Sequence, residues 1–164
     1  MVDGAAVEEG EARYQTRSAA LVEGLHAARR SGLPASLGKT TSNLFRHRLQ
    51  AARHRLDVRA FDHVLRIDAE RLTADVEGMI TYETLVEKTL AYGLLPAVVP
   101  QLKTITVGGA VSGLGIESSS FKYGLVHETV EAMDVLTGNG DIVACSACRT
   151  PDLFFGFPAL RRNS

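Results

Sequence analysis

The sequence lacks the features of a membrane or secreted protein. Its 164 residues contain no apolar run near the roughly 20 residues that a membrane-spanning helix needs. The first residues, MVDGAAVEEGEAR, are acidic and lack the basic start and apolar centre of a signal peptide. A net charge of -1 and 45% hydrophobic residues are typical of a soluble chain long enough for one domain. We therefore expect a cytoplasmic protein with no membrane span.

Cysteine is scarce, and the two cysteines present are Cys145 and Cys148, in the order Cys-Ser-Ala-Cys. A zinc site would need further cysteine or histidine ligands at matching spacing, and no second pair follows. A thioredoxin-like redox pair would begin a helix, whereas residues 141–146 have the pattern of the end of a strand. We expect two unrelated thiols.

Residues 29–66 carry an excess of positive charge, with nine arginines or lysines and three histidines against two aspartates. Such a run could follow a nucleic-acid backbone, but it contains only Phe45 and Phe61 as aromatic residues besides histidine, and no nucleic-acid motif. A solvated face, or a face beside an anionic cofactor, is the better interpretation, so no nucleic-acid partner is expected. The histidines His47, His54 and His63 do not repeat at the i, i+4 spacing of a helical metal pair, so we expect no metal site.

Local patterns predict a mixture of helices and strands. Residues 7–30 place Tyr14, Leu21 and Leu25 on one helical face, and Gly32 and Pro34 end this helix. The remaining predicted elements are strands over 63–68 and 72–77, a helix capped by Thr81 and ended by Gly93, a strand over 94–99, and a hairpin of strands over 129–137 and 141–146 around Gly138-Asn139-Gly140.

The most informative stretch is residues 104–124, TITVGGAVSGLGIESSSFKYG. Five glycines alternate here with four serines, and only Glu117 and Lys122 are charged. Glycine allows a positive φ and a close approach to the main chain, which favours amides presented to a phosphate. A helix starting after Gly109 would add unpaired N–H groups and the positive end of its dipole. Composition also allows a turn-rich loop with no ligand.

Neither common phosphate-binding motif is present. Gly38-Lys39-Thr40 resembles the end of a Walker A loop, but Leu33 stands where that loop needs its first glycine. Gly113-Leu114-Gly115 begins like a dinucleotide-binding fingerprint, but Ser118 occupies the position of the third glycine. A phosphate loop here would be of another type.

The order TVGG, a small-residue helix, GIESSSFKYG, a strand pair with a Gly-Asn-Gly turn and PDLFF resembles the FAD-binding domain of the PCMH-type (vanillyl-alcohol-oxidase superfamily) flavoproteins. Within that superfamily, residues 115–125 look most like the Δ24-sterol reductase (seladin) group, and the similarity covers about residues 55–155. The resemblance implies an α+β fold of strand pairs and sheet with flanking helices after an N-terminal helix. It also implies an FAD-dependent oxidoreductase that transfers hydride to or from a C–C bond of an apolar small-molecule substrate.

In that family the TVGG loop and the following helix hold the FAD pyrophosphate, and flavin contacts continue through the serine cluster. The cofactor-binding residues that the resemblance implies are Thr106, Val107, Gly108, Gly109, Ser112, Gly113, Gly115, Ile116, Glu117, Ser118, Ser119, Lys122, Tyr123 and Gly124. An earlier loop, residues 36–44, would also approach the pyrophosphate. Because it lacks the Arg-Gly-Gly-His pattern of covalent attachment, non-covalent FAD is expected. No catalytic acid or base is assigned.

The resemblance also suggests a division of the chain. Residues 1–54 would be an N-terminal helix and basic segment that begin the FAD-binding domain, residues 55–155 the PCMH-type domain, and residues 156–164 a truncated tail. Family members continue with a glycine-rich stretch and a substrate-selecting cap domain, and we expect this chain to lack both. An inactive flavin-binding fragment and a basic-faced interaction protein without cofactor stay open as alternatives.

Overall fold

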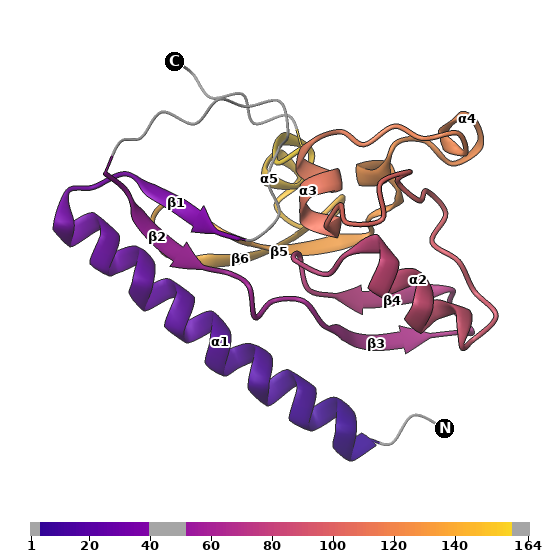
Figure 1. Ribbon diagram of the computed structural model, residues 1–164, viewed down its shortest axis with the longest axis horizontal. Helices are drawn as coiled ribbons and strands as arrows, with labels where there is room; N and C mark the ends of the chain where they lie inside the picture. The colour runs from indigo at the N-terminus through magenta and orange to yellow at the C-terminus, as the bar shows by residue number, and fades with distance from the viewer. Residues whose placement is uncertain (1–3, 40–51, 159–164) are drawn as a thin grey trace.

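The computed structural model describes residues 4–39 and 52–158 (Figure 1). In chain order the elements are α1 (Gly4–Ser31), β1 (Ala35–Gly38), β2 (His54–Asp57), β3 (Val64–Asp68), β4 (Thr73–Val76), α2 (Tyr82–Leu90), α3 (Val107–Ser112), α4 (Ser120–Tyr123), the 3-10 helix η1 (Val126–Thr129), β5 (Ala132–Leu136), β6 (Ile142–Ser146) and α5 (Pro151–Gly156). The strands of this part of the chain form separate pairs, which confirms the expected α+β class with strand pairs. None of the helices in these ranges is long and apolar enough to cross a membrane.

The long helix α1 lies along one side of the molecule, beside β1 and β2 (Figure 1). It confirms the helix expected over residues 7–30. Leu25 and Ala28 are buried on its inner face. The ring of Tyr14 packs edge-on against Phe61, with 6.4 Å between the ring centroids. The helix therefore joins the domain through the apolar face that its sequence predicts.

The strands β1 and β2 pair in parallel, with Ala35 opposite His54 and Gly38 opposite Asp57. A parallel pair needs a crossover connection. Here the connection includes residues 40–51, which lie outside the described part of the chain. The strand β1, from the expected N-terminal segment, thus forms a sheet with β2, which overlaps the start of the domain expected over residues 55–155.

The hairpin β3–β4 and helix α2 confirm the elements expected over 63–77 and after Thr81. The carboxylate of Asp68 accepts the main-chain N–H of Arg71 at 2.9 Å and so closes the tight turn between the strands. Thr81 caps α2 by accepting the N–H of Thr84 at 3.2 Å. Gly93, with a φ of 70°, lies just beyond the end of the helix.

The prediction of a strand over residues 94–99 is wrong, because this segment is irregular. Pro96 and Pro100 have no N–H to donate to a neighbouring strand. The carbonyl of Ala97 is instead satisfied by the hydroxyl of Ser119 at 2.9 Å. Val98 is nevertheless only 2% exposed. The apolar run was therefore correctly expected to be buried, but it is not a strand.

The strand expected over residues 129–137 is shorter than predicted, since β5 begins at Ala132. The preceding residues form η1, in which the hydroxyl of Thr129 donates to the carbonyl of Val126 at 2.7 Å. This side-chain bond favours a helical turn over an extended strand. The hairpin itself, with β6 as its second strand, is confirmed.

Two clusters of buried side chains form the interior. The larger joins the start of α2 to the irregular segment, α3 and η1, and consists of Ile80, Tyr82, Leu85, Val98, Ala110, Val111 and Val126. The smaller consists of Val135, Cys145 and Phe154. Val130, Met133 and Phe157 pack against both clusters. The larger cluster lies under the glycine-rich stretch and fixes its position.

The turn between β5 and β6 packs against α1. Gly140 has a φ of 98°, and a Cβ there would lie 2.6 Å from Cε1 of His26. On the next turn of the helix, Arg29 donates to the carbonyl of Asn139 at 3.1 Å. This position therefore requires glycine for both its backbone conformation and its contact with α1.

We expect Gly140→Ala to lower the free energy of unfolding by about 1–3 kcal/mol, because alanine is strained at this φ and its methyl group displaces His26. Urea denaturation measures the change. Gly138→Ala in the same turn is the matched control, since a Cβ at Gly138 meets nothing within 4 Å. Equal losses in the two variants would contradict the contact.

Candidate functional site

The glycine-rich stretch begins with a capped helix. The side chain of Thr106 accepts the N–H of Gly109 at 3.2 Å and serves as the N-cap of α3. The helix therefore starts at Val107 and not after Gly109 as expected from the sequence. The physical reason is that a threonine cap lies ahead of the two glycines.

The first amides of α3 are all bonded within the chain. Val107 donates to the carbonyl of Ile80 at 2.9 Å, and Gly108 donates to the carbonyl of Gly78 at 2.8 Å. Gly109 is bonded to the Thr106 side chain. The donors that normally stay unpaired at the start of a helix are thus satisfied by the protein itself.

Several glycines of the stretch are required by internal packing. A Cβ at Gly108 would lie 2.8 Å from the carbonyl oxygen of Gly78, and one at Gly109 would lie 2.9 Å from Oγ1 of Thr106. A Cβ at Gly113 would lie 2.8 Å from the carbonyl oxygen of Gly109. These separations are shorter than side chains tolerate. In this half of the stretch, the close approach that glycine permits is an approach of the chain to itself.

Side chains also hold the second half of the stretch in place. The hydroxyl of Ser120 accepts the N–H of Glu117 at 3.0 Å. Gly124 has a φ of 80° and follows the short helix α4. The carboxylate of Glu128 then accepts the N–H of Leu125 at 2.6 Å. The segment between Glu117 and Leu125 is thus a compact turn fixed at both ends.

Unpaired donors gather in this second half. Within residues 4–39 and 52–158, the main-chain N–H groups of Ile116, Ser118 and Ser119 have no hydrogen-bond partner. Lys122 is exposed, with its ammonium 4.9 Å from the ring centroid of Tyr123, and it forms no ion pair with another residue of those ranges. Free amides and a cation in one short segment are suited to an anionic group such as a phosphate.

Apolar side chains stand exposed around the same donors. Phe121 is 92% exposed and Ile116 is 71% exposed, and Leu114 and Tyr123 are also exposed. Grouped apolar residues at the surface are typical of a site that is covered by a ligand or another part of a protein. Donors and apolar surface together suit a molecule with both phosphates and a flat ring.

Tyr82, the first residue of α2, is a buried neighbour of this region. Burial, and secondly the charge of Glu117, raise the pKa of Tyr82 to about 12. Its hydroxyl therefore keeps its proton at neutral pH. Nothing in the local sequence connects Tyr82 to Glu117, because the two meet only through the fold.

His127 lies beside the carboxylates of Glu128 and Glu131 in the sequence, but the structure shows no bond between His127 and either of them within the described residues. The carboxylate of Glu128 accepts the N–H of Leu125, and Oε2 of Glu131 lies 3.8 Å from Nη2 of Arg71. Among the described residues, Nδ1 of His127 is buried without a hydrogen-bond partner. We assign no catalytic acid or base to this segment.

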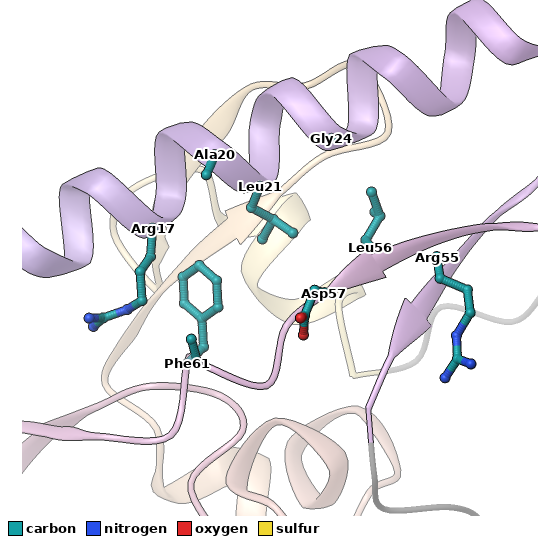
Figure 2. A pocket seen from close by; sticks show the side chains of 9 residues that line it. Arg17, Ala20, Leu21, Gly24, Arg55, Leu56, Asp57 and Phe61 are labelled. Carbon is teal, nitrogen blue, oxygen red and sulfur yellow. The ribbon is translucent and has the colours of Figure 1, made fainter.

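A cavity of about 270 Å³ lies between α1 and β2, away from the glycine-rich stretch. Figure 2 shows Leu21 and Leu56 projecting into it from the two elements, with the carboxylate of Asp57 nearby. Arg59 binds that carboxylate through its side chain at 2.9 and 2.7 Å and so holds the pKa of Asp57 well below its usual range. No residue of the glycine-rich stretch lines this cavity. It is therefore a separate feature.

The two cysteines are free and differ in exposure. Cys145 lies in β6, as expected for a strand end, and is 2% exposed, whereas Cys148 is exposed in the loop that follows. Burial, and secondly the charge of Asp134, raise the pKa of the Cys145 thiol. The pair thus lacks the paired, activated thiols of a redox motif.

Three relatives show what the chain is similar to. A family model described as an FAD binding domain matches residues 14–146. The chain is 39% identical over 109 residues to the Delta(24)-sterol reductase of Pisum sativum, covering 65% of this chain and 19% of that protein. The human enzyme of the same name is 34% identical over 95 residues, covering 58% and 18%. Cytokinin dehydrogenase 3 of Arabidopsis thaliana is 36% identical over 94 residues, covering 57% and 18%.

One solved structure supports the fold. The 6-hydroxy-D-nicotine oxidase of Arthrobacter nicotinovorans superposes with a TM-score of 0.71 at 20% sequence identity, covering 85% of this chain and 30% of that one. At this identity the likeness concerns the fold alone. The chain spans less than a fifth of the length of the sterol reductases that it matches.

We expect Gly108→Ala to lower the free energy of unfolding by about 1–3 kcal/mol in the absence of any ligand, because its methyl group collides with the backbone of Gly78. Gly78→Ala is the matched control, since a Cβ at Gly78 would lie 3.9 Å from Cα of Gly108, which is an ordinary van der Waals contact. Urea denaturation of both variants measures the difference. A Gly108→Ala protein as stable as the unmodified chain would show that the two backbones do not meet.

We expect an alkylating reagent at pH 8 to modify Cys148 rapidly and Cys145 only after unfolding. The raised pKa of Cys145 means that less of its thiol is ionised at this pH than in an ordinary cysteine, and the labelling rate should rise with pH. Mass spectrometry of peptides at timed intervals measures both rates. Equal rates in the folded protein would contradict the burial of Cys145.

Proposed function

The chain belongs to the family of FAD binding domains, and from this premise we propose that it binds FAD non-covalently along residues 104–124. One observation of the structure carries the proposal. Within the described residues, the segment of residues 114–123 combines the unpaired amides of Ile116, Ser118 and Ser119 with an exposed cation and exposed apolar side chains. This set of donors and surface fits a cofactor that has both a pyrophosphate and a flat ring system.

We assign different tasks to the two halves of the stretch. Thr106 to Gly109 support the site, because their polar groups already bond to the chain. The hydroxyl of Ser112 is also used internally, donating to the carbonyl of Gly108 at 2.8 Å. The direct contacts to FAD are therefore proposed for Gly115 to Ser119 and for Lys122. Of the earlier loop expected over residues 36–44, residues 36–38 belong to the strand β1, and residues 40–44 lie outside the described part of the chain.

The reaction that we propose is a flavin-mediated hydride transfer to or from a C–C bond of an apolar substrate, as in a sterol reductase. Bound FAD supplies the hydride chemistry. The contribution of this chain is to bind the cofactor and to hold its orientation. The names of the sterol reductases among its relatives support the substrate class.

A second candidate function is FAD binding without catalysis by this chain alone. It is favoured by the side chains around His127, which offer no partnered acid or base within the described residues. A basic-faced interaction protein has less support, because Arg59 and Arg66 lie in ion pairs with Asp57 and Asp75. Such pairing reduces the positive charge available to an anionic partner.

We expect FAD to raise the midpoint of thermal unfolding, because a ligand that binds only the folded state stabilises it. Ser118→Asp should weaken FAD binding at least about tenfold, since the new carboxylate repels the phosphates beside the free amides. Thermal unfolding at increasing FAD concentrations, with the visible absorption of the protein, measures both effects.

The control for charge is Ala19→Asp, which adds the same carboxylate at an exposed position of α1. It should bind FAD as the unmodified chain does. A well-folded chain that shows no FAD-dependent shift would contradict the proposed function. Unchanged affinity in Ser118→Asp would contradict only the placement of the site.

A further inference from the structure

A cluster of metal-ligating side chains lies at the open end of the β3–β4 hairpin. Asp62, His63 and Glu77 each place one ligand atom within 4.8 Å of the others. Nδ1 of His63 is 2.9 Å from Oε2 of Glu77 and 3.1 Å from Oδ1 of Asp62. We propose that these three residues form a binding site for one divalent transition-metal ion, with Zn²⁺ as its representative.

The pairing of the two strands brings the ligands together. Val64 is opposite Val76 in the antiparallel register, so His63 and Glu77 are neighbours across the hairpin. The main-chain N–H of Glu77 donates to the carbonyl of His63 at 2.9 Å. Asp62 lies in the cluster because it directly precedes His63 in the sequence. The ligands therefore lie on a hydrogen-bonded frame and not on separate mobile loops.

The spacing fits an ion. Ligand atoms that bind one ion at about 2.1 Å are about 3.0 Å apart at right angles and about 3.4 Å apart at the tetrahedral angle of most zinc sites. The two separations from Nδ1 of His63, 2.9 and 3.1 Å, match the right-angled arrangement and are a few tenths of an ångström shorter than the tetrahedral one. Without metal, a proton on Nδ1 can be shared with the carboxylates. The ion takes the place of that proton on Nδ1, and the neutral imidazole then carries its proton on Nε2.

Glu77 is held in position before any ion binds. Its side chain is 0% exposed, and it forms an ion pair with Arg17 through Oε1. The other oxygen, Oε2, accepts the main-chain N–H of His63 at 3.0 Å and faces the cluster. Partners of this kind orient ligating carboxylates in metal sites. Arg17 offsets the charge of one carboxylate, so the site keeps a net negative charge from Asp62 when His63 is neutral.

The other side of the cluster is open. The side chains of Asp62 and His63 are each 56% exposed, so an ion can enter and keep water at its remaining positions. Three protein ligands with an open position are the arrangement of many catalytic zinc sites. One imidazole with two carboxylates favours Zn²⁺, Co²⁺ or Mn²⁺ over Ca²⁺, which takes oxygen ligands.

The test uses the full chain without an affinity tag and without FAD. Calorimetric titration with Zn²⁺ should give one ion per chain, and Co²⁺ should produce a visible absorption band. His63→Ala and Asp62→Asn should each weaken binding at least about tenfold, because the first removes a ligand and the second replaces a charged carboxylate ligand by a neutral amide. Both side chains are exposed, and far-ultraviolet circular dichroism confirms that the variants remain folded.

His54→Ala is the matched control, since His54 lies in β2 outside the cluster. It should bind Zn²⁺ with unchanged affinity. The proposal is overturned by a folded chain that binds no Zn²⁺ or Co²⁺, by His63→Ala binding as tightly as the unmodified chain, or by an equal loss in His54→Ala. Because FAD is absent, these outcomes are independent of the proposed flavin site.

Discussion

The close approach of two backbones at Gly78 and Gly108 is the contact on which the rest of the site depends. The N–H of Gly108 donates to the carbonyl of Gly78 at 2.8 Å, where a Cβ at Gly108 would collide. One residue before Gly78, the buried carboxylate of Glu77 binds Arg17 of α1. Two residues after it, the carbonyl of Ile80 accepts the N–H of Val107. A single short segment thus connects the long helix, the β3–β4 hairpin and the glycine-rich stretch.

This connection explains why the stretch contains so many glycines and yet divides into two parts. In the first part, glycine allows the chain to pack against itself and α3 to start directly on Thr106. In the second part, amides near Ser118 have no hydrogen-bond partner among the residues that the structure describes, and apolar side chains such as Phe121 stay exposed. A rigid frame followed by free donors is the organisation that a preformed cofactor site needs, because ordering the loop then costs little free energy on binding.

Sequence alone predicted the elements whose signals are local. The apolar face of α1, the Thr81 cap of α2 and the turn ending at Gly140 each depend on a few neighbouring residues, and each was found. The family resemblance predicts an FAD site on residues 104–124, and this placement stays a prediction. What sequence could not predict depends on distant partners. The contact of Gly108 with Gly78 joins segments about 30 residues apart, and the cluster of Asp62, His63 and Glu77 exists only once β3 and β4 have paired.

The division of the stretch is tested most directly by amide hydrogen exchange, measured by nuclear magnetic resonance with and without FAD. Internal bonds protect the amides of Val107, Gly108 and Gly109, so these should exchange slowly in both states. The amides of Ser118 and Ser119 should exchange rapidly without FAD and slowly with it. Amides of residues 107–109 that exchange rapidly without FAD and become protected on its addition would contradict the account.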